Sequence, residues 1–155
     1  MSDITATPLI PTDSKAAHSG VRPVDPTYDA SAVVNLIDIG FGEELDPQGR
    51  KMLRQMQQAV RWSRWAPWFF GPVLDAHGFV YVWKGRVVGN LSLRQALPYS
   101  SRGCLVGNVV VHSDYRGRGL GRALVEAAME AARAQSARWI GLEVRADNAV
   151  ACHLY

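Results

Sequence analysis

Residues 109–122 read VVVHSDYRGRGLGR, in which three valines typical of a buried strand lead into a turn with three glycines. A helix is predicted directly after the turn, over about 119–136, because apolar residues recur there at helical spacing. The first amides of a helix have no partner within the helix, and the helix dipole places positive charge at that end. Gly117, Gly119 and Gly121 allow the backbone to approach a ligand closely. With the charges of Arg116, Arg118 and Arg122, this turn is predicted to bind a diphosphate.

Two other kinds of glycine-rich turn fit the segment less well. A P-loop requires Gly-Lys-Ser or Gly-Lys-Thr, whereas this chain has Gly121-Arg122-Ala123. A dinucleotide-binding turn requires glycine at 117, 119 and 122, but position 122 of this chain is an arginine. Glu143, on the other hand, does lie near the position where such proteins have their ribose-binding acid. Nucleotide binding therefore stays open as an alternative, and so does a turn without any ligand.

The periodicity of the remaining chain predicts a sheet with helices around it. Asp25 and Pro26 are expected to begin a first helix, which ends at the Gly40-Phe41-Gly42 break, and Pro67 is expected to end a second one. The predicted strands are 21–24, 79–83, 87–94, 104–111 and 139–144, and the predicted helices are 26–40, 47–66, 119–136 and 147–155. This order predicts an α/β or α+β fold with a crossover near the C-terminal end.

The composition is that of an ordinary globular protein of one domain. The chain has 155 residues, 48% of them hydrophobic and 20% charged, with a formal net charge of +3. The polar residues 1–20 are expected to form a flexible tail, and residues 21–155 the domain. Two cysteines exclude a disulfide scaffold, and neither a membrane span nor a signal peptide is visible, so a cytoplasmic location is expected. The four histidines and two cysteines show no metal-ligand spacing, and no metal is expected.

The spacing Arg116-x-x-Gly119-x-Gly121 resembles the pyrophosphate-binding turn of the GNAT family of N-acetyltransferases. The resemblance implies that this turn holds the diphosphate of acetyl-CoA and that the preceding strand pairs with the pantetheine arm. The cofactor-binding residues that it implies here are Val109, Val110, Val111, Arg116, Gly117, Arg118, Gly119, Leu120, Gly121 and Arg122.

A second block, residues 142–155, is similar to the strand and Asn-x-x-Ala-x-x-Leu-Tyr helix of the same family. Its Leu-Glu-Val-Arg opening is closest to the bacterial ribosomal-protein alanine acetyltransferases. The resemblance implies that Asn148 contacts CoA, that Glu143 is the base or orders a water, and that Tyr155 is the acid for the departing thiolate. Asn148 is equally suited to cap the last helix. Family members continue past Leu-Tyr into two more strands, so the domain is expected to be incomplete at this end.

The resemblance implies a mixed, mostly antiparallel sheet flanked by helices, and direct transfer of an acetyl group from acetyl-CoA to a primary amine. The acceptor stays open between a small-molecule amine, a lysine and a protein N-terminus, and so does the formation of a homodimer. One alternative is a non-catalytic acyl-CoA-binding module, because residues 107–109 offer no carboxylate. Another is an arginine-rich RNA binder, although neither nucleic acid nor a membrane is expected as a partner. The aromatic residues 62–70 and the acidic pair Glu43-Glu44 are weaker candidates for contacts with the acceptor.

Overall fold

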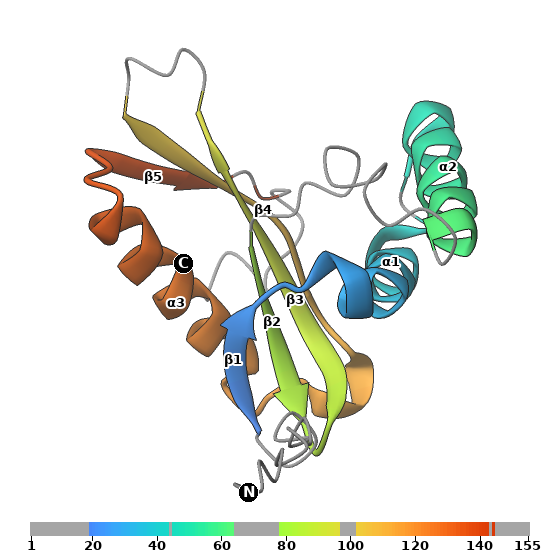
Figure 1. Ribbon diagram of the computed structural model, residues 1–155, viewed down its shortest axis with the longest axis horizontal. Helices are drawn as coiled ribbons and strands as arrows, with labels where there is room; N and C mark the ends of the chain where they lie inside the picture. The colour runs from blue at the N-terminus through green and yellow to red at the C-terminus, as the bar shows by residue number, and fades with distance from the viewer. Residues whose placement is uncertain (1–18, 44, 64–77, 97–101, 143, 145–155) are drawn as a thin grey trace, which may run out of the picture.

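The computed structural model describes residues 19–43, 45–63, 78–96, 102–142 and 144, which form one five-stranded sheet with helices on both faces (Figure 1). The strands are β1 (Gly20–Pro23), β2 (Gly78–Trp83), β3 (Arg86–Gln95), β4 (Gly103–Val111) and β5 (Trp139–Leu142), and they lie side by side in chain order. From β1 to β4 each strand is antiparallel to the next, whereas β5 runs parallel to β4. The sheet is therefore mixed and mostly antiparallel, as predicted.

Helix α3 (Leu120–Ala134) covers one face of the sheet, and α1 (Pro26–Phe41) and α2 (Pro47–Ser63) lie on the other (Figure 1). On the α3 side, Leu124 and Ala128 are fully buried against β3 and β4. On the opposite side, α1 lies so close to β4 that a Cβ at Gly40 would stand 2.8 Å from a methyl carbon of Val110. A second, smaller core joins α1 to α2 through Val34, Ile37 and Leu53.

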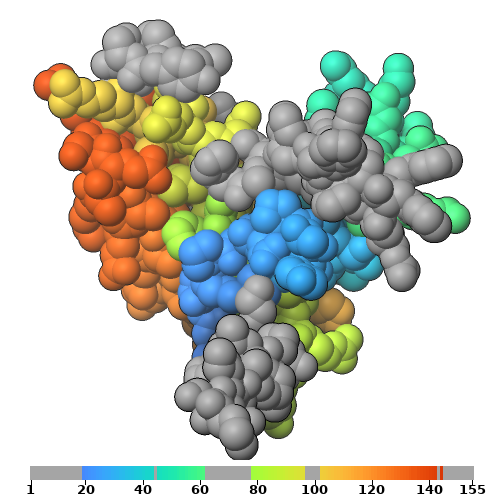
Figure 2. Space-filling view, viewed as in Figure 1, coloured from blue at the N-terminus to red at the C-terminus, as the bar shows by residue number. Residues whose placement is uncertain are grey.

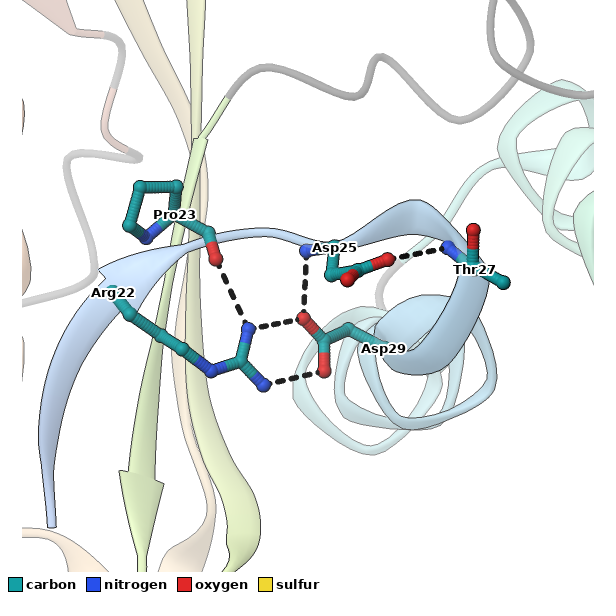
Figure 3. Close-up of polar contacts among 5 residues, drawn as sticks. All are labelled: Arg22, Pro23, Asp25, Thr27 and Asp29. Carbon is teal, nitrogen blue, oxygen red and sulfur yellow. Dashed lines mark hydrogen bonds and ion pairs between the residues drawn. The ribbon is translucent and has the colours of Figure 1, made fainter. Parts of the chain in front are cut away.

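The link from β1 to α1 is held by a buried carboxylate (Figure 3). Asp29 is 3% exposed, and its Oδ2 and Oδ1 accept hydrogen bonds from Nη1 and Nη2 of Arg22 at 2.5 and 2.7 Å. The backbone N–H of Asp25 donates to the same carboxylate at 2.8 Å. The hydrogen bond to Asp29 raises the pKa of Arg22 above its ordinary value, although partial burial acts against it. Asp25 caps α1 as predicted, since its side chain accepts from the backbone N–H of Thr27.

The observed elements agree with the sequence to within a few residues. β1 begins at Gly20, one residue before the predicted start, and Val24 still donates to the carbonyl of Gly78 just beyond its end. β5 ends at Leu142, opposite Val106, whereas the sequence predicted a strand to Val144. Residues 64–66 and the predicted helix 147–155 lie outside the described residues. Among the described helices, none has the length and apolar character that a membrane crossing requires.

Candidate functional site

The candidate site begins where β4 and β5 part. Their parallel pairing runs from Gly103–Trp139 to Val106–Leu142, and β4 then continues to Val111. Within the described residues, no strand pairs with 107–111 on the side that β5 occupies earlier. Among the described strands, this second half of β4 therefore lies at an edge of the sheet, and it leads directly into the glycine-rich turn.

A bulge in β4 marks the point where the two strands part. Asn90 of β3 is opposite Val110 and Ser92 is opposite Gly107, so β4 has one more residue between these pairs than β3 has. Asn108 lies in this bulge with a φ of 50°, in the left-handed region that asparagine tolerates better than most residues. Asn90, only 3% exposed, donates from Nδ2 to the carbonyl of Asn108 at 3.1 Å. The two asparagines thus fix the bend in β4.

Substitutions at Asn108 provide a test of the bulge. Asn108→Val is expected to lower the free energy of unfolding by about 1–2 kcal/mol, because a β-branched residue is strained at positive φ. Asn108→Gly, which has no such strain, is the matched control and is expected to remain close to the wild type. Urea unfolding of both variants measures the difference, and equal stability of the valine and glycine variants would show that the positive φ does not matter.

Alternation along the ladder decides which backbone groups of β4 face the unpaired side. The N–H of His112 donates to the carbonyl of Val88 at 2.9 Å, so His112 directs its backbone groups toward β3. In an antiparallel ladder such residues alternate, so Val110 also faces β3, while Val109 and Val111 face the other side. The carbonyl of Val111 accepts from Nε of Arg116 at 3.0 Å. Of the three predicted valines, Val109 and Val111 therefore direct their backbone groups to the edge, where the Val111 carbonyl already accepts from Arg116.

The turn after β4 is open to the surroundings and lined by backbone. Gly117 and Gly119 have φ values of 72° and 77°, and a Cβ at either position would meet no heavy atom within 4 Å. Gly119 is the N-cap of α3 and supplies no side-chain cap, and the first intrahelical bond runs from Ala123 N–H to the Gly119 carbonyl. The amides of residues 120–122 therefore precede the first helical bond and point out of the helix end. An anion would meet backbone donors and the positive end of the helix dipole there.

The three predicted arginines have different surroundings. Arg116 is held to the Val111 carbonyl, as described above, and the exposed Arg122 has no hydrogen bond or ion pair with any described residue. The guanidinium of Arg118 lies 5.7 Å from the ring centroid of Trp83 and 5.5 Å from that of Tyr115. It also donates to the carbonyl of Asp114 at 3.3 Å. Arg118 thereby attaches the turn to the β2–β3 hairpin, a contact that joins residues distant in sequence and was not predicted.

The structure also describes three other residues that the sequence offered as candidates, His112, Cys104 and Glu43. His112 is half-buried, and its Nδ1 accepts from the backbone N–H of Asp114, beside the short 3-10 helix Ser113–Tyr115. Cys104 is a buried free thiol within the core, in agreement with the packing role expected for it. Glu43 is exposed. The described residues contain no group of three or more potential metal ligands. Outside the described residues lie Glu143, Asn148 and Tyr155, and with them Glu44, Cys152 and most of the aromatic residues 62–70.

Comparison with protein families gives one match. The family model described as Acetyltransferase (GNAT) family matches residues 43–155, a span that contains β2 to β5, α3 and the glycine turn. A search of curated proteins gave no match.

Solved structures with the same fold are numerous. A GCN5-related N-acetyltransferase from Ralstonia eutropha is 20% identical with a TM-score of 0.62, covering 88% of this chain and 90% of its own. A ribosomal-protein-alanine N-acetyltransferase from Brucella melitensis is 21% identical with a TM-score of 0.61, covering 86% and 79%. A protein from Salmonella typhimurium, described as an acetyltransferase with its cofactor acetyl-CoA, is 18% identical with a TM-score of 0.62, covering 86% and 74%.

Proposed function

Because the chain belongs to the acetyltransferase (GNAT) family, we propose that it is an N-acetyltransferase that uses acetyl-CoA as its cosubstrate and a primary amine as its acceptor. The observation that carries this proposal is the continuity of the unpaired β4 edge with the open glycine turn at the start of α3. The solved Salmonella typhimurium relative with acetyl-CoA supports the same cosubstrate. Acetyl-CoA supplies a thioester whose carbonyl carbon an amine can attack.

The described residues fit such a cosubstrate at two points. A diphosphate fits the turn because the space beside Gly117 and Gly119 is empty and the first α3 amides are free to donate. An amide-rich arm fits the β4 edge because Val109 and Val111 turn backbone groups toward it. Arg122 adds a charge at the helix end, while Arg118 holds the turn in position from the hairpin side. These contacts would orient the thioester along β4.

Glu143 and Tyr155 are proposed as the catalytic pair, on the basis of the second sequence block. An amine attacks only when it is deprotonated, so Glu143 accepts its proton, directly or through a water. The departing thiolate needs a proton, which the Tyr155 hydroxyl donates, since a phenol with a pKa near 10 is protonated at neutral pH. Transfer is direct, without an acetylated enzyme, because neither residue serves as a nucleophile in this scheme.

The proposal is tested in two steps on the full chain. Calorimetry with acetyl-CoA is expected to give saturable heat, and release of free thiol is then expected when primary amines are added. Heat without thiol release from any amine would favour an acyl-CoA-binding module instead, a function that the exposed Asn108 and the lack of a carboxylate at 107–109 also allow. Absence of heat with both CoA and acetyl-CoA would overturn the assignment to an acetyl-CoA site.

Gly119→Ala tests the turn itself. The added Cβ would occupy the open space beside the helix end, and the affinity for acetyl-CoA is expected to fall about tenfold as amide contacts to the ligand are lost. Gly85→Ala is the matched control, because Gly85 has the same kind of backbone, with φ of 78° against 77°, in the β2–β3 turn. Both variants should lose similar stability, because each places alanine at a positive φ. A loss of affinity seen by calorimetry only in Gly119→Ala therefore comes from lost ligand contacts and not from backbone strain. Equal losses of affinity in the two would contradict the role of the turn.

A further inference from the structure

Helix α2 carries a row of exposed arginines that the proposed acetyl-CoA site does not use. Within its range, Pro47–Ser63, it has Arg50, Lys51, Arg54 and Arg61, and no acidic residue. At 100° per residue, the three arginines lie within about 40° of one another around the helix axis. They form a single stripe about 16 Å long, since each residue adds about 1.5 Å. We call this row, Arg50, Arg54 and Arg61, the α2 stripe.

Within the described ranges, the arginines of the stripe have no ion-pair partner. Arg54, Arg61 and Lys51 are exposed and make no ion pair with any residue in the described ranges, and Arg50 donates to the carbonyl of Leu45. Two acids border α2 without forming an ion pair with the stripe: Asp38 of α1 accepts from Gln57, which lies on α2 between Arg54 and Arg61, and Asp46 accepts from the backbone N–H of Gly49 at the start of the helix.

Two charges of the stripe are unfavourable for the helix, whereas Arg61, in the last turn, lies favourably at the negative end of the helix dipole. Arg50 and Arg54 are like charges at i and i+4, an arrangement that destabilises a helix. Arg50 also lies in the first turn, at the positive end of the helix dipole, where acidic residues are favoured; this turn contains none, and Asp46 caps the helix just before it. Each effect costs only tenths of a kcal/mol, but both act in the same direction. An anionic partner that lies along the stripe would relieve them.

The stripe is also separate from the diphosphate turn. α2 packs on α1, and α1 packs on the face of β4 that bears Val110, whereas the arginines of the turn lie at the start of α3, which covers the opposite face (Figure 1). Figure 2 shows α2 as an outlying part of the molecule at the upper right. An anion bound to α2 is therefore a second ligand, separate from acetyl-CoA. It lies on the side of β4 that α1 covers.

From this arrangement we propose that α2 binds the acceptor, and that the acceptor is a polypeptide with acidic residues beside its reactive amine. The inference rests on the proposed function and adds the acceptor class. Guanidinium groups bind carboxylates in a bidentate manner, and the length of the stripe matches about five residues of extended chain. A row of carboxylates in such a chain would neutralise the stripe, while its amine remains available to the transfer site.

The probe for the test is a peptide with a free N-terminal amine, a run of glutamates about as long as the stripe, and a fluorophore at its C-terminus. Fluorescence anisotropy is expected to show binding that weakens as salt is added. The double variant Arg54→Gln/Arg61→Gln is expected to bind it about fivefold more weakly, since two exposed ion pairs are lost. The control Arg133→Gln/Arg138→Gln removes the same charge from exposed positions at the end of α3 and before β5, and should bind like the wild type.

Three results would overturn the inference: equal weakening in the two double variants, equal binding of a peptide with glutamine in place of glutamate, or tighter binding of an RNA oligonucleotide of the same charge. The last would reassign the stripe to nucleic acid. Peptide binding is measured without acetyl-CoA, and calorimetry with acetyl-CoA is expected to be unchanged in both double variants. A failure of the acetyl-CoA site is therefore visible separately from a failure of the stripe.

Discussion

Replacing Asp29 by alanine is expected to lower the free energy of unfolding by about 3 kcal/mol. The substitution removes the carboxylate that holds both guanidinium nitrogens of Arg22 and the backbone N–H of Asp25. Arg22 is then left half-buried without its counter-charge, and the Asp25 N–H is left without this acceptor. Because these groups join β1 to the first turn of α1, their loss loosens the attachment of the helix to the sheet.

Urea unfolding of Asp29→Ala and of the control Asp38→Ala measures this effect. Asp38 is an exposed acid on the same helix, and its bond to Gln57 is at the surface, so its removal should cost no more than about 0.5 kcal/mol. The variant Asp29→Asn, whose side chain has nearly the same shape, is expected to have a free energy of unfolding between those of Asp29→Ala and Asp38→Ala. It still provides a measurement if Asp29→Ala does not fold. Similar midpoints for Asp29→Ala and Asp38→Ala would show that the buried pair adds nothing to stability.

Replacing Tyr155 by phenylalanine is expected to lower kcat about a hundredfold, with little change in the KM for acetyl-CoA. The substitution removes only the hydroxyl that is proposed to protonate the departing thiolate, and it leaves the ring in place. The loss should therefore occur in the chemical step, not in binding. Steady-state thiol release with a reactive amine gives both constants.

Tyr28→Phe is a control for the same chemical change. Tyr28 lies on α1 and is 76% exposed, so its variant should keep the kinetic constants of the wild type. If Tyr155→Phe instead raises the KM for acetyl-CoA and leaves kcat unchanged, Tyr155 has a role in binding or packing and a different group protonates the thiolate.

The elements of the fold could be predicted from sequence because their signals are local. Asp25 and Pro26 mark the start of α1 by their own chemistry, and three glycines between a valine run and an apolar helix mark the β4–α3 turn. In each case the residues that determine the structure are neighbours in the chain. Mixed strand directions were expected from the family resemblance, and the observed register confirms them.

The features that sequence did not predict depend on contacts between residues of different elements. Arg22 and Asp29 are only seven residues apart, but no local pattern indicated their pairing, because it forms only once α1 folds back on β1. The bulge at Asn108 becomes visible only through its pairing with β3, although asparagines within two valine-rich strands were an available signal. The contact of Arg118 with Trp83 likewise requires the β2–β3 hairpin to lie beside the turn.

The edge of β4 beyond Val106 has a further consequence for the kinds of molecule that can bind there. A sheet edge recognises a ligand through alternating N–H and C=O groups, and this mode, known as β-augmentation, depends little on side chains. An extended peptidomimetic with the same alternation could thus occupy the edge at Val109 and Val111 in place of a natural ligand. Ligands for this edge could accordingly be built on a backbone scaffold, and contacts with the bulge at Asn108 would supply their selectivity.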